Sequence, residues 1–229
     1  MDTHSSMREP GRVIELRRDR DLFLLDLGEG DNRFNPASIS RIHDLLDEVE
    51  AAPEPRGLVT VATGKIWHNG LDLDWLGAHG DQLSEFLAQV QTLLARLLVL
   101  PVPTVAAVQG HCFAAGAMFA LAHDARVMRS DRGFFCLPEI DIRMSFPPGM
   151  AALVQSRLSA SVAFEAMTTG RRYGGKDAAA LGIVGCSFAE DELLPAALEL
   201  ARSNAAKDAR TLAAIKRTVC AAPHAALLA

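Results

Sequence analysis

The sequence lacks closely spaced cysteine pairs. Its four cysteines, Cys112, Cys136, Cys186 and Cys220, are scattered, and no His or Cys pair has the spacing of a zinc site. We therefore expect reduced thiols, no bound metal and a cytoplasmic location, because disulfides persist mainly in oxidising compartments.

Long apolar runs and an excess of positive charge are also missing. No stretch reaches the roughly 20 apolar residues needed to cross a bilayer, so no membrane partner is expected. The 23 Lys and Arg residues are outnumbered by 28 Asp and Glu residues, giving a formal net charge of -5. That balance argues against a nucleic-acid partner, which normally needs a basic face. Residues 1–12 are polar and contain no signal-peptide core, so we interpret them as a flexible leader.

Several common motifs of nucleotide-binding proteins and hydrolases are absent. Gly64 and Lys65 are followed by Ile66 rather than by the rest of a phosphate loop, and Gly28 and Gly30 have no third glycine at dinucleotide-binding spacing. No GxSxG or HExxH motif occurs. Phosphate-loop, dinucleotide-binding, serine-hydrolase and zinc-protease interpretations therefore have no support.

What the sequence does contain is an alternation of strand and helix patterns that favours a layered α/β core. Short apolar runs predict strands, and apolar residues at helical spacing predict helices. The expected strands are residues 13–17, 22–27, 58–62, 104–108, 126–128 and 134–137. The expected helices are residues 36–50, 83–100, a third after 114–117, and then 151–157, 160–168, 176–181 and 193–206. We divide the chain into a core at 13–190 and a helical C-terminal region at 191–229.

Two segments share one design, in which a buried strand leads into a turn of small residues and then a helix. One strand, 58–62, precedes residues 67–73 (WHNGLDL), and the other, 104–108, precedes residues 109–117 (QGHCFAAGA). The first N–H groups of a helix have no partner inside it, and the helix dipole favours negative charge there. Two such N–H groups aimed at one point would form an oxyanion hole.

The two segments, in this order, resemble those of the crotonase (enoyl-CoA hydratase/isomerase) family. HNGLDL at 68–73 resembles its first oxyanion segment, and PTVAAVQGHCFAAGAMFALAHDARV at 103–127 resembles the second. LPEIDI at 137–142 and KDAAALGIV at 176–184 match later landmarks of the family. Within the family, the chain looks most like the monofunctional Δ3,Δ2-enoyl-CoA isomerases of peroxisomal type. The resemblance implies a spiral of ββα units with a helical C-terminal region, and a homotrimer or a dimer of trimers.

The resemblance also implies a site that binds an acyl-CoA thioester. Leu71 and Ala115 would each supply a backbone N–H to the thioester oxygen. The other implied substrate-binding residues are Asn69, Gly70, Asp72, Gly116 and Met118. Asp72 could equally be an ordinary helix cap, and the two roles are compatible. No cofactor is implied, because coenzyme A is part of the substrate.

The chain departs from the family's pattern at two acidic positions. Hydratases place one carboxylate where this chain has Met118, so a mechanism that needs two carboxylates is disfavoured. Peroxisomal-type isomerases place their glutamate at a position that falls on Pro148, which cannot move a proton. Glu139, at the position of the second hydratase carboxylate, is then the best candidate for a catalytic base.

Other interpretations of these residues remain open. Glu139 could instead pair with Arg143, and Asp141 is a weaker alternative base. His68 and His111 flank the two turns, and such histidines are more often structural than catalytic. We expect the acyl path to be lined by Trp67, Trp75, Leu76, Phe86 and Met118.

Three functions compete. The first is an enoyl-CoA isomerase that moves a double bond through a thioester enolate, with Glu139 carrying the proton. The second is a hydratase, or another crotonase reaction, that uses Glu139 alone. The third is an acyl-CoA-binding protein without catalysis, which Pro148 favours.

Overall fold

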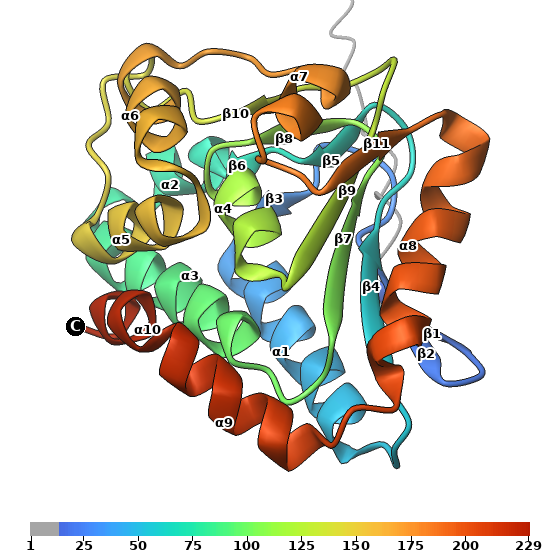
Figure 1. The fold of residues 1–229 in the computed structure, drawn as a ribbon. Helices are drawn as coiled ribbons and strands as arrows, with labels where there is room; N and C mark the ends of the chain where they lie inside the picture. Colours follow the sequence, from blue (N-terminus) through green and yellow to red (C-terminus); the bar gives the residue numbers. More distant parts are fainter. Residues whose placement is uncertain (1–13) are drawn as a thin grey trace, which may run out of the picture.

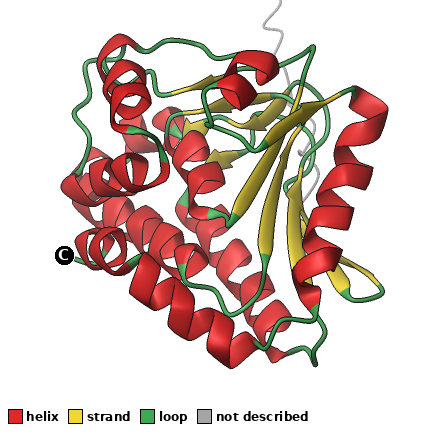
Figure 2. Ribbon diagram, viewed as in Figure 1, coloured by secondary structure: helices red, strands yellow, loops and turns green. Residues whose placement is uncertain are grey.

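The computed structural model describes residues 14–229, so the expected leader at 1–12 and Val13 lie outside the described residues. Its centre is a six-stranded sheet flanked by helices (Figures 1 and 2). In spatial order the strands are β1 (Glu15–Asp19), β2 (Leu22–Asp26), β4 (Gly57–Val61), β7 (Thr104–Val108), β9 (Ala125–Arg129) and β11 (Cys186–Phe188). The first pair is an antiparallel hairpin, and all the other pairs are parallel.

Helices cover both faces of this sheet, which explains why β4 and β7 are buried along their whole length. Leu58 and Ala106 belong to the main core, which lies on the side of α1 (Pro36–Ala51), α3 (Leu83–Leu98) and α4 (Ala115–Ala122). Val59 and Val105, their neighbours in sequence, pack instead with α8 (Glu190–Ala205) on the other face. Successive side chains of β4 and β7 point to opposite faces of the sheet, so each strand contributes residues to both hydrophobic cores.

Two small parallel sheets lie beside the main one and carry the turns predicted from the sequence. One contains β10 (Phe135–Cys136), β8 (His111–Phe113) and β5 (Ile66–His68), and the other contains β3 (Arg33–Phe34) and β6 (Gly70–Leu71). Each buried strand thus leads through a short strand to a helix. β4 leads to β5, β6 and α2 (Leu73–Ala78), and β7 leads to β8 and α4. This is the expected repetition of ββα units.

The remaining helices are α5 (Pro148–Arg157), α6 (Ala160–Thr169), α7 (Gly175–Ala180), α9 (Ala209–Val219) and α10 (Ala221–Leu227), and a single 3₁₀ turn, Gly80–Gln82, precedes α3. Of these helices, α7 lies beside β9 and β11, and the others lie on the side of the molecule where α3 lies (Figure 1). α10 packs against α5 and α3. The contact is close at Gly149, where an added Cβ would lie 2.4 Å from the backbone oxygen of Ala226.

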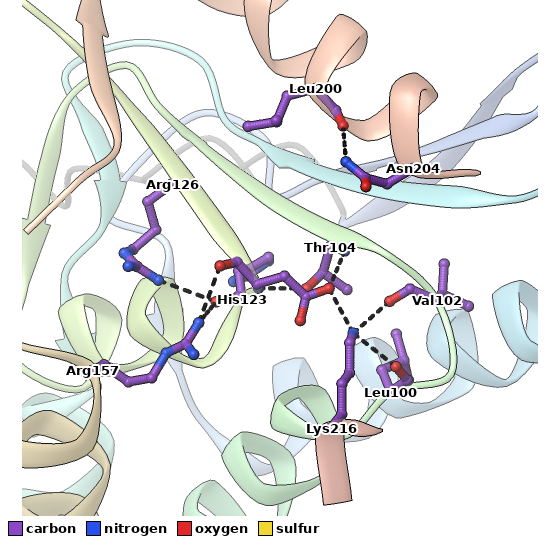
Figure 3. Close-up of polar contacts among 10 residues, drawn as sticks. Leu100, Val102, Thr104, His123, Arg126, Arg157, Leu200, Asn204 and Lys216 are labelled. Carbon is purple, nitrogen blue, oxygen red and sulfur yellow. Dashed lines mark hydrogen bonds and ion pairs between the residues drawn. The ribbon is translucent and has the colours of Figure 1, made fainter. Parts of the chain in front are cut away.

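A buried lysine on α9 binds the segment between α3 and β7 (Figure 3). Lys216 Nζ donates to the backbone oxygens of Leu100, at 2.9 Å, and Val102, at 2.8 Å, and lies 2.6 Å from Asp124 Oδ2. The same carboxylate accepts the N–H of Thr104 at the start of β7. Burial lowers the pKa of Lys216, and the charge of Asp124 opposes that shift. The C-terminal helices are thereby tied to the turn between α4 and β9.

The differences from the expected elements are confined to ends and to short segments. The short strands β3, β5, β6, β8 and β11 were not predicted, α2 was expected only as the helix after the first turn, and α9 and α10 only as part of a helical region. No helix among residues 14–229 is both long enough and apolar enough to span a membrane.

Candidate active site

A mostly apolar cavity of about 220 Å³ lies where the two predicted turns meet. Residues from both turns line it: Asn69 and Leu71 from the first, and Phe113, Ala114 and Ala115 from the second. The rest of its wall is formed by Leu73, Leu87, Met118, Pro138, Glu139, Ile142, Met144, Ser145, Phe146, Pro147 and Met150. Glu139 is the single ionisable side chain among these lining residues.

The first turn is held by strand pairing. Asp72 N–H donates to the backbone oxygen of Phe34 in β3, at 2.8 Å. Successive N–H groups of a strand point in opposite directions, so the N–H of Leu71 lies on the side of β6 away from β3. Asp72 also caps α2, because its side chain accepts the N–H of Trp75 at 3.2 Å. The helix-cap interpretation of Asp72 is therefore what the structure shows.

The second turn presents the first residue of α4. Ala115 is the first helical residue, so its N–H has no partner inside the helix. Ala114 precedes it with φ 51° and ψ -128°, a conformation that favours glycine and costs a residue with a Cβ about 1–3 kcal/mol. Within residues 14–229, the Ala115 N–H donates to no acceptor outside α4, and the Leu71 N–H donates to none outside the β3–β6 ladder.

Gly70 is the point of contact between the two turns. Its φ is +83°, and a Cβ added there would lie 2.9 Å from the Cβ of Ala114 and 3.2 Å from the nitrogen of Ala115. Only a glycine lets the two chains approach this closely. The absence of a side chain at Gly70 therefore brings the residue before Leu71 directly against Ala115.

Glu139 enters the cavity from the turn that follows β10. Its side chain is 7% exposed, and its Oε2 is buried without a hydrogen-bond partner. Desolvation by burial raises the pKa of Glu139 to about 7, and a bond from its own backbone opposes this only in part. No ion pair between described residues includes Glu139, so the alternative pairing with Arg143 is not found.

The other candidate residues have separate positions. Gly70, Asp72 and Gly116, expected to bind substrate, shape the turns and do not line the cavity, whereas Asn69 and Met118 do. Asp141 is exposed beside Gly170, and a Cβ on that glycine would lie 2.6 Å from the carboxylate. Pro148 is the first residue of α5 and is not among the lining residues.

Both flanking histidines lie outside the cavity wall. The ring of His111 lies 5.0 Å from that of Phe113 and 5.5 Å from that of Phe134. His68 is buried, and its Nδ1 accepts the N–H of Gly70 at 3.1 Å.

The expected acyl lining is wrong except at Met118. Trp67 is fully buried in the core against Phe119, and Phe86 turns toward Trp75 with ring centroids 5.1 Å apart. The apolar wall comes instead from Leu73, Leu87 and the segment 142–150. That segment is an irregular loop followed by a helix, so its direction could not be predicted from a repeating pattern.

No cluster of three or more His, Cys, Asp or Glu side chains able to hold a metal ion occurs in the part of the chain that the structure describes. All four cysteines are free thiols, and Cys186 alone among them is exposed.

The sequence pattern of the family described as enoyl-CoA hydratase/isomerase matches residues 24–228. The chain belongs to this family. It is 37% identical to the enoyl-CoA delta isomerase 2, peroxisomal, of Arabidopsis thaliana over 207 residues, covering 85% of this chain and 86% of the relative. It is also 34% identical to the enoyl-CoA delta isomerase 1, peroxisomal, of the same plant over 190 residues, covering 80% and 78%. The predicted resemblance to the isomerase branch is thus confirmed.

A solved structure supports the fold. An enoyl-CoA hydratase/isomerase family protein from Pseudomonas syringae superposes with a TM-score of 0.88 at 23% identity, covering 93% of both chains. The predicted crotonase fold, a spiral of ββα units with a helical C-terminal region, is confirmed.

The expected cytoplasmic location is wrong, because both Arabidopsis relatives are named as peroxisomal proteins. The expectation rested on four unpaired thiols. Free thiols indicate a reducing compartment, and reducing conditions are not confined to the cytoplasm.

Proposed function

We propose that this protein is a Δ3,Δ2-enoyl-CoA isomerase that uses Leu71 and Ala115 to stabilise a thioester enolate and Glu139 to carry the proton. The observation that carries the proposal is the placement of Glu139. It is the one ionisable group lining the cavity, one of its oxygens has no partner, and both turns open into the same space.

The two N–H groups would act on the thioester oxygen. Removing a proton from C2 places negative charge on that oxygen, and fixed donors in a water-poor cavity stabilise such charge strongly. A donor of this kind typically accounts for about 2.7–4 kcal/mol of the barrier. The N–H of Ala115 also lies at the positive end of α4, which adds to the stabilisation.

Glu139 would move one proton between two carbons. Its carboxylate takes the proton from C2, the electron pair forms the dienolate, and the resulting carboxylic acid returns the proton to C4. The double bond between C3 and C4 thereby becomes a double bond between C2 and C3. A pKa of about 7 suits both halves of this cycle, because the group must accept and release a proton with similar ease.

Met118 favours isomerisation over hydration. It is 1% exposed and lines the cavity at the position where hydratases of the family have a carboxylate. Water addition needs a group to hold and activate the water, whereas proton transfer along the substrate needs only one base. An apolar wall at this point keeps water away from the enolate.

The direct test supplies the purified protein with a 3-enoyl-CoA and follows the formation of the conjugated 2-enoyl-CoA. We expect conversion by the wild type and a loss of about 10²–10⁴-fold in kcat for Glu139→Gln, which keeps the shape of the side chain without its basicity. Release of 3-hydroxyacyl-CoA from a 2-enoyl-CoA would identify a hydratase. Tight acyl-CoA binding without any turnover would identify a binding protein.

We also propose that the reaction needs no metal or redox cofactor, that it serves fatty-acid metabolism, and that the protein assembles as a trimer or a dimer of trimers. Exposed apolar side chains near the C-terminus, Ile215 and Val219 of α9 and Leu228 after α10, offer contact area for such an assembly. Light scattering coupled to gel filtration measures the assembly, and activity that survives exhaustive chelation would support the metal-free reaction.

A further inference from the structure

His68 lies between the two turns that form the candidate site. It is the last residue of β5, directly before the first turn, and its ring is 2% exposed. It does not line the cavity, so it cannot touch a bound substrate there. Its contacts reach each element that carries one of the two proposed N–H donors.

The first contact fixes the turn that carries Leu71. His68 Nδ1 accepts the N–H of Gly70, two residues further along the chain, at 3.1 Å. Asn and Asp side chains make the same contact in Asx-turns, where it holds the local backbone in a tight bend. The imidazole here replaces the amide or carboxylate of such a turn.

The second contact is with the first turn of α4. A Cβ added to Gly116 would lie 2.6 Å from the backbone oxygen of His68 and 2.8 Å from its Nδ1. Gly116 follows Ala115 directly, so His68 packs against the backbone that carries the second N–H. Any side chain at position 116 would push α4 and His68 apart.

The third contact is with the strand that pairs with the first turn. The ring centroids of His68 and Phe34 lie 4.0 Å apart, and Phe34 is paired with Leu71 in the β3–β6 ladder. One side chain therefore touches β3, the turn at Gly70 and the start of α4 at once.

The imidazole must be neutral to make these contacts, because a protonated Nδ1 cannot accept a hydrogen bond. Burial lowers the pKa of His68 to about 3, so the ring is neutral near pH 7. With Nδ1 as the acceptor, the proton of the neutral ring resides on Nε2.

We propose that His68 is a positioning residue, which sets the separation between the Leu71 and Ala115 N–H groups by holding the Gly70 turn against the start of α4. This inference rests on the proposed oxyanion role of those two N–H groups. A shift of about 1 Å in a reacting geometry can cost about 10²-fold in rate. The effect of His68 is therefore expected to be larger in kcat than in KM.

The test compares two substitutions of equal size. His68→Asn keeps an oxygen that can accept the Gly70 N–H in an ordinary Asx-turn, whereas His68→Leu fills similar space without an acceptor. We expect His68→Leu to lower kcat by about 10- to 100-fold with a smaller rise in KM from the weakened thioester contact, and His68→Asn to restore most of kcat.

A binding measurement separates this inference from the isomerase proposal. An acyl-CoA thioester and the matching thioether, which lacks the carbonyl oxygen, are titrated into each variant. We expect the wild type and His68→Asn to prefer the thioester, and His68→Leu to lose most of that preference. A wild type that shows this preference but no turnover would overturn the isomerase proposal alone. A wild type that does not distinguish the two ligands would overturn the oxyanion role of the two N–H groups, and with it the inference about His68.

His123 provides the matched control. It is also fully buried, its pKa is also about 3, and it bonds Thr60 Oγ1 at 2.7 Å near the other end of α4. His123→Asn should lower stability while leaving kcat and the thioester preference unchanged in the folded protein. Equal values of kcat and thioester preference for His68→Leu and His68→Asn, after correction for the folded fraction, would contradict the positioning role.

Discussion

At the scale of single residues, the site depends on one carboxyl group placed in an apolar wall. The sequence predicted Glu139 as the candidate base through the LPEIDI segment, which resembles a landmark of the family. It could not show that Oε2 has no partner, since that depends on side chains from several distant segments. For the same reason it assigned no role to His68, whose contact with Gly116 exists only in the folded chain.

The raised pKa of Glu139 predicts how activity depends on pH. The proposed base must be ionised in the free enzyme, and its pKa is about 7. We therefore expect kcat/KM to rise with pH and to reach half of its plateau near that value. The measurement is a pH profile of 3-enoyl-CoA conversion, and a profile already flat from about pH 5 upward would rule out a buried base of this kind.

The same group predicts a stability effect of opposite sign. The ordinary pKa of 4.5 applies to the unfolded chain, whereas the folded value is about 7. Below the lower value both states are protonated, and as pH rises between the two values only the unfolded chain releases its proton. The native state is thus progressively destabilised, by up to about 3 kcal/mol above the folded pKa.

Glu139→Gln should consequently be more stable than the wild type at about pH 8, by about 1–3 kcal/mol, and nearly equal to it at about pH 4. Urea unfolding at the two pH values measures the difference. Glu165→Gln is the control, because Glu165 is bound by Arg171 and Tyr173 and its pKa is lowered. A constant difference for Glu139→Gln across this range would contradict the raised pKa.

At the scale of elements, the long strands and helices were predictable because each carries a repeating pattern. The expected strand at 104–108 coincides with β7, and the helix expected at 36–50 is α1 with one residue more. The short strands β3, β6 and β8 are too brief to carry a pattern, and their existence depends on pairing with distant segments. These unpredicted strands are the ones that bring the two turns together.

Gly70 provides a test of that convergence. Gly70→Ala adds a Cβ that would lie 2.9 Å from the Cβ of Ala114, in addition to the strain of a positive φ. We expect a loss of about 10²-fold or more in kcat because the two N–H groups are forced apart. Steady-state kinetics with 3-enoyl-CoA measures the effect.

Gly182→Ala is the matched control for this substitution. Gly182 also has a positive φ, +72°, but an added Cβ would meet no atom within 4 Å. Both variants should lose about 1 kcal/mol or more of stability from backbone strain. Only Gly70→Ala should lose activity, and equal kcat values for the two variants would show that the contact at Ala114 does not matter.

At the scale of the whole molecule, the C-terminal helices support the wall of the cavity. α10 packs on α5, and Pro147 and Met150, at the start of α5, line the cavity. The Lys216 contacts hold α9 in place, and α10 follows α9 directly in the chain (Figure 3). The sequence predicted a helical region here, but a buried lysine among backbone oxygens has no signature in sequence.

Lys216→Met should remove the hydrogen bonds and the ion pair that hold α9 in place. Methionine replaces the apolar part of the lysine side chain at similar size. The backbone oxygens of Leu100 and Val102 lose their donor, and Asp124 loses its cation. We expect the free energy of unfolding to fall by about 2–4 kcal/mol, with little change in kcat at low temperature. Urea unfolding measures the loss, and the exposed Lys207→Met should cost less than about 0.5 kcal/mol. Equal stability of the two variants would contradict the role given to Lys216.

The proposal that both turns hold one thioester carbonyl is tested most directly by a crystal structure of Glu139→Gln with a 3-enoyl-CoA bound. We predict the thioester oxygen within hydrogen-bond distance of both the Leu71 and Ala115 nitrogens, with the side chain of residue 139 facing C2. A thioester oxygen bound by neither N–H, or a C2 facing away from residue 139, would contradict the account.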